Sequence, residues 1–180
     1  GDTGSVCVMD VRTGEILALV STPSYDPNAF VTPSRSKERL DLLSDKSLPF
    51  LNRATSSRYP PGSVFKLVTA LAALEAGVID ANTVLECHGE YYLNPHSRAF
   101  HCWSEIGHGD ISLEKALERS CNVFFYQVGR LLGADRLAHF ARNIHLGDPI
   151  AIELPSSARG VIPDSSWKRD ELGEHWYQGE

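Results

Sequence analysis

The chain has 180 residues, of which 42% are hydrophobic and 22% are charged, an ordinary balance for a globular domain with a real core. Its formal charge of −6 and pI near 5.6 give no basic footprint, which argues against nucleic acid as a partner. The sequence has no run of about 18 apolar residues, so it predicts no membrane span. Its opening GDTGSV has no features of a signal peptide and is typical of a piece of a longer chain.

The chain begins with two apolar, β-branched runs, GSVCVMDV and GEILALVST, on either side of an Arg-Thr-Gly turn. They predict a hairpin over residues 4–21 whose strands lie against a core helix. Cys7 lies in this hairpin and is expected to be a small buried hydrophobe. Residues 23–59 turn to Ser, Pro, Asp and Arg with one helical patch around Lys37–Leu43, which predicts a long excursion.

The stretch RYPPGSVFKLVTALAALEAG, residues 58–77, predicts a helix of about 14 residues. Pro60, Pro61 and Gly62 form an entry turn, and Gly77 has the position of the residue after a helix end. The body is apolar on every side, which is typical of a helix in a core. Since one hairpin is the only evident part of a sheet, some of this apolar surface is expected to be exposed in this chain, at a cost in stability.

Lys66 lies one turn into that apolar segment. Its ammonium must either extend to water or have its pKa shifted by partners, and a neutral Lys66 can take a proton from Ser63, which lies on the same helix face. The alternative, in which Ser63 caps the helix and Lys66 extends to water, stays open on this stretch alone. The Ser-x-x-Lys pattern is weak because it also occurs, by accident, at Ser34/Lys37, Ser112/Lys115 and Ser165/Lys168.

Residues 78–111 form a second irregular stretch, rich in His, Gly and aromatic residues, and helices follow it. Ser112 is expected to cap a helix that runs to about Arg119, a second helix continues to Gly133, and an amphipathic third helix ends at Gly147. The triplet Ser120-Cys121-Asn122 lies between the first two helices. Its hydroxyl and carboxamide either relay a proton and hold an amide substrate or simply cap the helix junction. The tail, residues 158–180, shows no clear periodicity.

Three cysteines, Cys87, Cys102 and Cys121, fall in or after the His-rich stretch together with His108. Three thiolates and one imidazole suit tetrahedral Zn²⁺, although the paired Cys-x-x-Cys spacing is missing. One disulfide with a free thiol, or simply reduced cysteines, are the alternatives. His88 and His101 are the alternatives to His108 as the imidazole ligand of the zinc ion.

Taken together, the Tyr-Pro-Pro-Gly-Ser-x-x-Lys entry, the Ser-x-Asn triplet 57 residues after Ser63 and the phrase FFYQVGRLLG resemble the penicillin-binding protein transpeptidases, within the serine acyl-transferase and β-lactamase superfamily. The segments MDVRTGEILALVSTPSYDPNAF and WKRDELGEHWYQG narrow the resemblance to class B, elongation-type members. The resemblance implies an α/β fold of α+β type, with helices packed on an antiparallel sheet. Residues 1–180 would form part of one transpeptidase domain, incomplete at its C-terminus.

The resemblance also implies a D,D-transpeptidase with four named roles. Ser63 would be the acylated nucleophile, Lys66 its general base and Ser120 a proton shuttle, and Asn122 would bind the substrate amide. The substrates would be peptidoglycan stem peptides, β-lactams would trap the acyl-enzyme, and the process would be cell-wall elongation and maintenance of cell shape.

The Ser-x-Asn triplet at residues 120–122 corresponds to the family's second motif. Class B members of the elongation type can hold zinc beside this motif. The resemblance therefore implies a structural Zn²⁺ on Cys87, Cys102, His108 and Cys121, and no organic cofactor. It also implies a periplasmic location, a parent protein anchored in the inner membrane by an N-terminal segment, and partners among a membrane glycosyltransferase and elongation-complex proteins.

The family's third motif, Lys-Thr/Ser-Gly on a strand, is not in this sequence. That strand would also contribute an oxyanion-hole N–H, so this chain alone is expected to be inactive. The alternative functions are a β-lactamase-like hydrolase and a non-catalytic fragment of the same fold, stabilised by zinc or sensing β-lactams.

Overall fold

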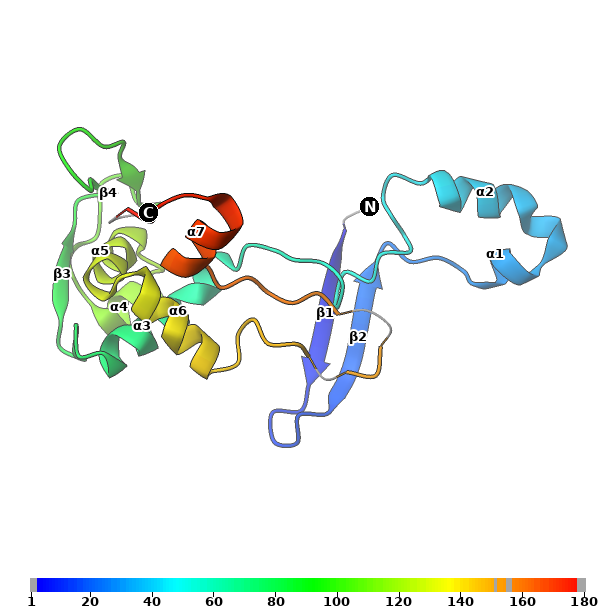
Figure 1. Cartoon of the computed structure of the whole chain (residues 1–180), viewed down its shortest axis with the longest axis horizontal. Helices are drawn as coiled ribbons and strands as arrows, with labels where there is room; N and C mark the ends of the chain where they lie inside the picture. Colours follow the sequence, from blue (N-terminus) through cyan, green and yellow to red (C-terminus); the bar gives the residue numbers. More distant parts are fainter. Residues whose placement is uncertain (1–2, 151, 155–156, 178–180) are drawn as a thin grey trace. The chain divides into compact units, whose positions relative to one another are not determined.

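The structure is a computed structural model that describes residues 3–150, 152–154 and 157–177 (Figure 1). The chain divides into two compact units. The first comprises residues 1–59 with 149–159, and the second comprises residues 60–148 with 160–180. No helix of the described residues is both long and apolar enough to cross a membrane.

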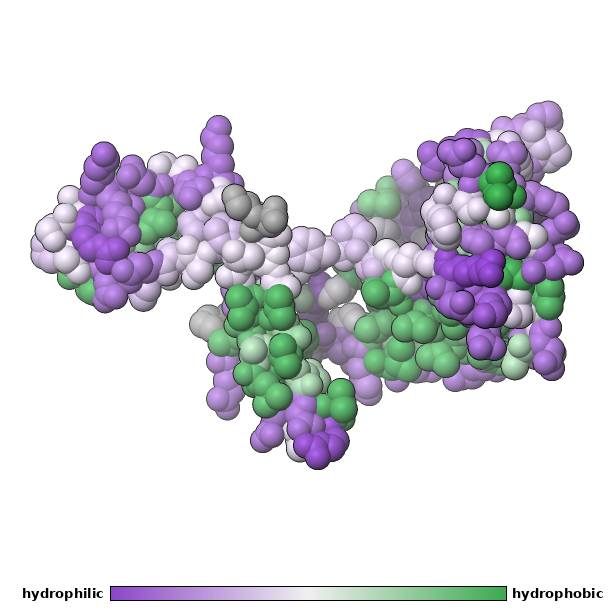
Figure 2. All heavy atoms as spheres, turned by 180° about the vertical axis from the view of Figure 1, so that it is seen from behind, coloured by the Kyte–Doolittle hydropathy of each residue, from purple (hydrophilic) through white to green (hydrophobic). Residues whose placement is uncertain are grey.

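The first unit contains the predicted hairpin, formed by β1 (Gly4–Met9) and β2 (Ile16–Thr22), which pair antiparallel. Figure 2 shows apolar side chains gathered over it. Most of its side chains are exposed, and Cys7 is among them, so the expectation of a buried Cys7 is wrong for this chain. The reason is that two strands alone cover neither of their faces. The packing of this hairpin on the core helix stays a prediction, because that helix lies in the other unit.

The excursion after the hairpin is partly helical. It contains α1 (Asn28–Val31), a 3₁₀ turn (Pro33–Arg35) and α2 (Ser36–Ser44), so the helical patch predicted around residues 37–43 is confirmed. The Arg35 guanidinium donates to both Asp26 and Glu38, which ties the segment just before α1 to α2.

In the second unit, the helix of about 14 residues predicted within residues 58–77 is present as a 3₁₀ turn (Gly62–Val64) followed by α3 (Phe65–Glu75). Gly77 ends it with φ +64°, as expected for the residue after a helix. One side of the helix is buried in the core and comprises Thr69, Ala70, Ala72 and Ala73. Leu67, Leu71 and Leu74 lie at i, i+4 and i+7 on another face and are exposed, so the expected apolar surface open to water is confirmed.

The stretch over residues 78–111 was expected to be irregular, but the structure places four short strands there. β3 (Val84–Cys87) pairs antiparallel with β6 (Gly109–Ser112), and β4 (Glu90–Tyr91) pairs antiparallel with β5 (Phe100–His101). Strands of two or four residues are too short to show an alternating pattern, which is why the sequence did not reveal them.

Four helices follow the strands: α4 (Leu113–Glu118), α5 (Asn122–Leu132), α6 (Ala134–Asn143) and α7 (Ser165–Leu172). Ser112 caps α4 as predicted, since its side chain accepts a hydrogen bond from the backbone N–H of Lys115. The third helix ends at Asn143, four residues before the predicted end. α7 was not predicted, although Asp164 caps its start and Gly173 ends it with φ +69°.

The core of the second unit forms where α3, α5 and α6 pack against one another and β3 lies beside α5 (Figure 1). Its largest fully buried side chains come mainly from α5 and include two cysteines. They are Phe124, Leu132, Val123, Val128, Cys87 and Cys121. Helices packed around short antiparallel sheets confirm the α+β character of the fold.

Candidate active site and adjoining metal cluster

Ser63 and Lys66 are positioned by the tight entry to α3. Gly62 adopts φ +58°, a conformation that favours glycine, and this turns the chain into the 3₁₀ segment that carries Ser63. Ser63 is exposed, whereas Lys66 lies in the first turn of α3 and is half-buried. Within the described residues, neither this 3₁₀ segment nor α3 has a side-chain cap hydrogen bond, so Ser63 does not have the simple capping role.

Ser120 is placed by the way α4 ends. The backbone N–H of Cys121 donates to the carbonyl of Ala116, and that of Ser120 donates to the carbonyl of Leu117. These two bonds form a Schellman motif with Ser120 at the left-handed position, where its φ is +50°. Glycine is usual there, so a serine is strained by about 1–2 kcal/mol. A non-glycine residue held in this conformation is typical of a functional site.

Cys121 and Asn122 start the next helix. The Cys121 sulfur accepts a hydrogen bond from the backbone N–H of Phe124 and caps α5, and Asn122 is the first residue of that helix. The Asn122 amide is oriented on both sides, because its Oδ1 accepts from Lys66 and its Nδ2 donates to the carbonyl of His101 at 3.2 Å.

The Lys66 ammonium links the two segments. Its Nζ donates to the Ser120 carbonyl at 2.8 Å, to Ser120 Oγ at 3.0 Å and to Asn122 Oδ1 at 2.6 Å. Ser120 Oγ is also 3.1 Å from Ser63 Oγ and donates to it. A continuous chain of polar atoms therefore runs from Lys66 Nζ through Ser120 Oγ to Ser63 Oγ, along which a proton can move.

Lys66 does not simply extend to water. Burial lowers the pKa of its ammonium below the ordinary value of 10.5, and the nearby sulfurs of Cys102 and Cys121 oppose this shift. Its charge also lies 5.8 Å from the centre of the Phe125 ring. A lysine with a lowered pKa, in hydrogen-bond contact with a hydroxyl, has the properties of a general base.

The other three Ser-x-x-Lys matches lie elsewhere and have other contacts. Ser34 and its lysine are exposed. Ser112 caps α4, and the lysine of that match pairs with Glu118. Ser165 starts α7 and bonds to Asp135 through both its N–H and its hydroxyl. Among the described residues, no hydrogen bond joins any of these three serine hydroxyls to the ammonium of its lysine.

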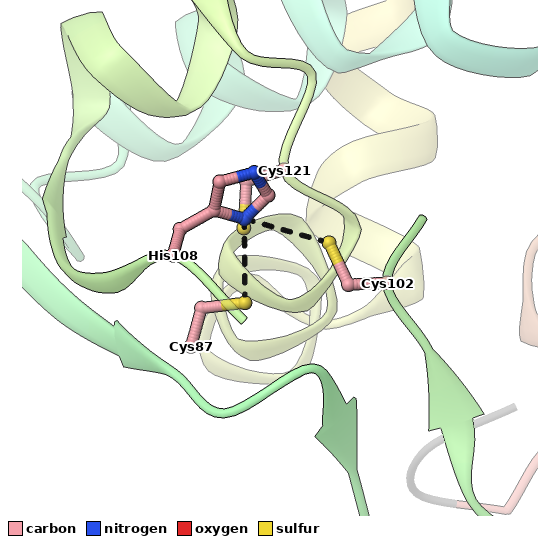
Figure 3. A group of neighbouring side chains, drawn as sticks. All are labelled: Cys87, Cys102, His108 and Cys121. Atoms are coloured by element: carbon pink, nitrogen blue, oxygen red, sulfur yellow. Dashed lines mark hydrogen bonds between the residues drawn. The ribbon is translucent and has the colours of Figure 1, made fainter. Parts of the chain in front are cut away.

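The four residues predicted to bind zinc come together beside this site (Figure 3). The sulfurs of Cys87, Cys102 and Cys121 and a ring nitrogen of His108 all lie within 4.8 Å of one another. His108 Nδ1 is 3.6 Å from both Cys87 Sγ and Cys102 Sγ. The rivals are not part of the cluster: His88 is exposed and pairs with Glu86, and the side chain of His101 is exposed.

Two glycines allow the backbone to fold around this cluster. A Cβ at Gly107 would lie 2.0 Å from the Cys87 carbonyl oxygen, and one at Gly89 would lie 2.1 Å from the Glu105 carbonyl oxygen. Backbone hydrogen bonds then join the ligand segments: the His108 N–H donates to the Cys87 carbonyl, and the Cys102 N–H donates to the Gly89 carbonyl. The His- and Gly-rich composition of this stretch therefore reflects a closely packed loop pair.

The electrostatics of the cluster fit a cation. Burial raises the pKa of the Cys121 thiol to about 12, so its thiolate needs a compensating positive charge. Burial also acts to raise the pKa of Cys102, but the backbone N–H groups of Ser104, Asn122 and Val123 outweigh it and lower that pKa. Three sulfurs and one imidazole nitrogen match the donor set of tetrahedral zinc, for which neighbouring ligand atoms lie about 3.8 Å apart. All four cysteines of the chain are free thiols in the structure.

Sequence reasoning missed two contributions next to Cys102. The His101 carbonyl orients Asn122, and the Trp103 indole N–H donates to the Arg119 carbonyl at 2.8 Å. A backbone carbonyl leaves no signal in a sequence. The tryptophan beside a candidate ligand was the one available hint.

Comparisons with known proteins show similarity to one family. The family described as the penicillin binding protein transpeptidase domain matches residues 4–176. The peptidoglycan D,D-transpeptidase MrdA of Escherichia coli K12 is 42% identical over 180 residues, which are all of this chain and 28% of that protein. The chain therefore spans less than a third of the length of this curated relative.

Solved structures show the same fold. Penicillin-binding protein 2 (PBP2) of Pseudomonas aeruginosa in complex with WCK 5153 is 37% identical, with a TM-score of 0.91 over 100% of this chain and 41% of that one. PBP2 of Helicobacter pylori in complex with MreC is 33% identical, with a TM-score of 0.90 over 98% of this chain and 32% of that one.

Proposed function

Because the chain belongs to the penicillin-binding protein transpeptidase family, we propose that it carries the acylation site of a peptidoglycan D,D-transpeptidase, with Ser63 as the nucleophile. The observation that carries this proposal is the polar chain from Lys66 Nζ through Ser120 Oγ to the exposed Ser63 Oγ. A serine hydroxyl becomes a strong nucleophile only when a base removes its proton. The chain of polar atoms connects the Ser63 hydroxyl to Lys66, whose pKa is lowered.

In the proposed reaction, Ser63 Oγ attacks the carbonyl carbon between the two terminal D-alanines of a stem peptide. Its proton passes through Ser120 Oγ to neutral Lys66 and then to the leaving D-alanine amine. The stem remains bound to Ser63 as an ester. An amine of a second stem attacks that ester, gives up its proton along the same path, and restores the Ser63 hydroxyl as the cross-link forms. β-Lactams would acylate the same oxygen.

In this proposal, Asn122 holds the substrate amide. Its Oδ1 is occupied by Lys66, and one N–H of its amide donates to the His101 carbonyl, which leaves the second N–H for a substrate carbonyl. The family's third motif is not among the 180 residues, so we assign activity to the full-length protein and not to this chain by itself.

We also propose that Cys87, Cys102, His108 and Cys121 hold a structural zinc ion, and that no organic cofactor takes part. When bound, the ion would compensate the charge of the buried thiolates. Because Cys121 lies between Ser120 and Asn122, fixing its sulfur fixes the backbone of the second motif. The cluster thereby supports the polar chain without entering the reaction.

The cellular setting is likewise a proposal. MrdA is named a peptidoglycan D,D-transpeptidase, and a PBP2 has been solved with MreC. By this similarity, the parent protein works at the periplasmic face of the inner membrane, anchored there by a segment outside these residues. Its partners would be elongation-complex proteins and a membrane glycosyltransferase, and its role would be cell-wall elongation and cell shape.

The experiment that tests the activity uses the full-length protein with a peptide ending in D-Ala–D-Ala and an amine acceptor. We expect release of D-alanine with transfer of the acyl group, complete loss of both in Ser63→Ala, and full activity in the matched control Ser34→Ala. Hydrolysis without transfer would instead support a hydrolase. Binding of penicillin without any turnover of the peptide would support a sensor.

A further inference from the structure

Trp103 makes a hydrogen bond that the proposed mechanism does not yet use. The last carbonyls of a helix have no partner within it and need one from outside. At the end of α4, the carbonyl of Arg119 receives the indole N–H of Trp103 at 2.8 Å. Trp103 is otherwise 65% exposed, which is unusual for a residue whose large aromatic ring serves packing alone.

The peptide unit that accepts this bond is the one that joins Arg119 to Ser120. Its carbonyl is held by Trp103, and its N–H donates to the Leu117 carbonyl at 3.1 Å. The plane of this peptide is therefore fixed from both ends. Because φ of Ser120 is the rotation about the bond that leaves this plane, fixing the plane helps to hold Ser120 at φ +50°.

The next peptide unit is held in the same way. The Ser120 carbonyl accepts from Lys66 Nζ at 2.8 Å, and the Cys121 N–H donates to the Ala116 carbonyl at 2.9 Å. Four hydrogen bonds thus hold the two peptides that flank Ser120. Three of them come from the α4 turn and from Lys66, and Trp103 supplies the fourth.

Trp103 is itself oriented by the Cys/His cluster that we propose to bind zinc. It follows Cys102 directly, and its ring packs edge-on against His108 with 5.2 Å between ring centres. An aromatic pair of this geometry limits the rotation of the indole. The N–H is therefore already directed when it meets the Arg119 carbonyl.

We propose that Trp103 is a positioning residue for acylation: its indole N–H holds the Arg119–Ser120 peptide so that Ser120 Oγ stays between Lys66 Nζ and Ser63 Oγ. This inference rests on the proposed function, since it concerns the geometry of the same proton path. Without the N–H, the Arg119 carbonyl turns to water, Ser120 relaxes from its strained conformation, and its hydroxyl leaves the line between the two other atoms.

The test separates the binding of penicillin from the acylation step in the full-length protein. Stopped-flow acylation gives the dissociation constant of the reversible complex and the rate constant of ester formation. For Trp103→Phe, which keeps a ring and removes the N–H, we expect the rate constant to fall about tenfold, equivalent to about 1.4 kcal/mol, with the dissociation constant unchanged. The matched control Trp167→Phe, which removes an indole N–H on α7, should acylate at the normal rate.

A second variant guards against loss of packing. Replacing Trp103 with β-(3-benzothienyl)alanine keeps the size and shape of the side chain and removes only the N–H donor. We expect the same loss in rate, with zinc content and melting temperature close to those of the unaltered protein. An unaltered rate in this variant would overturn the proposal. A weaker dissociation constant with a normal rate would also overturn it, because it would make Trp103 a substrate contact.

Failure of this inference is distinguishable from failure of the proposed function. If Ser63→Ala is acylated as fast as the unaltered protein, the function assigned to Ser63 is wrong. If Ser63→Ala is inert while both Trp103 variants acylate normally, only the role of Trp103 is wrong.

Discussion

Gly107→Ala tests how the loop pair shapes the proposed zinc site. The new Cβ would lie 2.0 Å from the Cys87 carbonyl oxygen and 2.7 Å from both the Gly89 nitrogen and the His88 carbonyl carbon. All three are backbone atoms, so no side chain can turn aside to relieve the overlap. The backbone of Cys87 or of residue 107 must move.

The required movement is large for a metal site. Contacts to a Cβ under 3.0 Å essentially do not occur, so the two segments must separate by about 1 Å, whereas metal–ligand distances tolerate about 0.2 Å. The movement also breaks the hydrogen bond from the His108 N–H to the Cys87 carbonyl, worth about 1 kcal/mol. Alanine at φ +79° costs about 1 kcal/mol more. We expect about 2 kcal/mol of lost stability before the loss of zinc is counted.

The matched control is Gly109→Ala. Gly109 also has a positive φ, +65°, but a Cβ there meets nothing within 4 Å, so the control carries the conformational cost without the overlap. Zinc per chain by elemental analysis, thermal melting with and without a chelator, and penicillin labelling should all separate the two variants. If Gly107→Ala keeps its zinc and melts together with Gly109→Ala, the close approach of these loops does not form the site.

Three further predictions concern Lys66 and Asp164. Lys66→Arg, which keeps the positive charge but cannot deprotonate, should reduce acylation by at least about 100-fold without changing the melting temperature; acylation at a normal rate would show that Lys66 is not the base. In the unaltered protein, the acylation rate should rise with pH as Lys66 loses its proton, along a limb centred below 10.5 because burial lowers this pKa; a rate that falls over this range would contradict the assignment. Asp164 caps α7 and accepts from Arg142, and its pKa is lowered from 3.8 to about 2, first through the Trp167 backbone N–H. The ionised Asp164 carboxylate should contribute on the order of 1–2 kcal/mol to the free energy of unfolding, in full above pH 4 and progressively less between about pH 4 and 2. Denaturant titrations should therefore find Asp164→Asn destabilised at neutral pH and less sensitive to acid in this range.

The elements that the sequence predicted are those with strong local signals. The N-terminal hairpin has two apolar runs around a glycine turn, α3 has its Pro-Gly entry and Gly77, and α4 has the cap at Ser112. The four strands between residues 84 and 112 escaped because their hydrogen bonds, and not their side-chain pattern, define them. α7 escaped although Asp164 and Gly173 mark its two ends, because its apolar pattern is weak.

In the candidate site, too, part could be predicted from the sequence and part could not. The residue types at Ser63, Lys66, Ser120 and Asn122 are visible in the sequence, and the resemblance to a known family selects them. Their contact across 57 residues, however, depends on α3 packing beside the α4–α5 junction. The left-handed conformation of Ser120 and the role of the Trp103 N–H arise only from that packing, so no local pattern could reveal them.

The most direct test of this account is to find where penicillin attaches. The full-length protein is treated with penicillin, digested, and mapped by mass spectrometry, with Ser63→Ala in parallel. The account predicts one adduct, on the Ser63 hydroxyl, and no adduct in the Ser63→Ala protein. An adduct on any other residue, or the same labelling in both proteins, would contradict it.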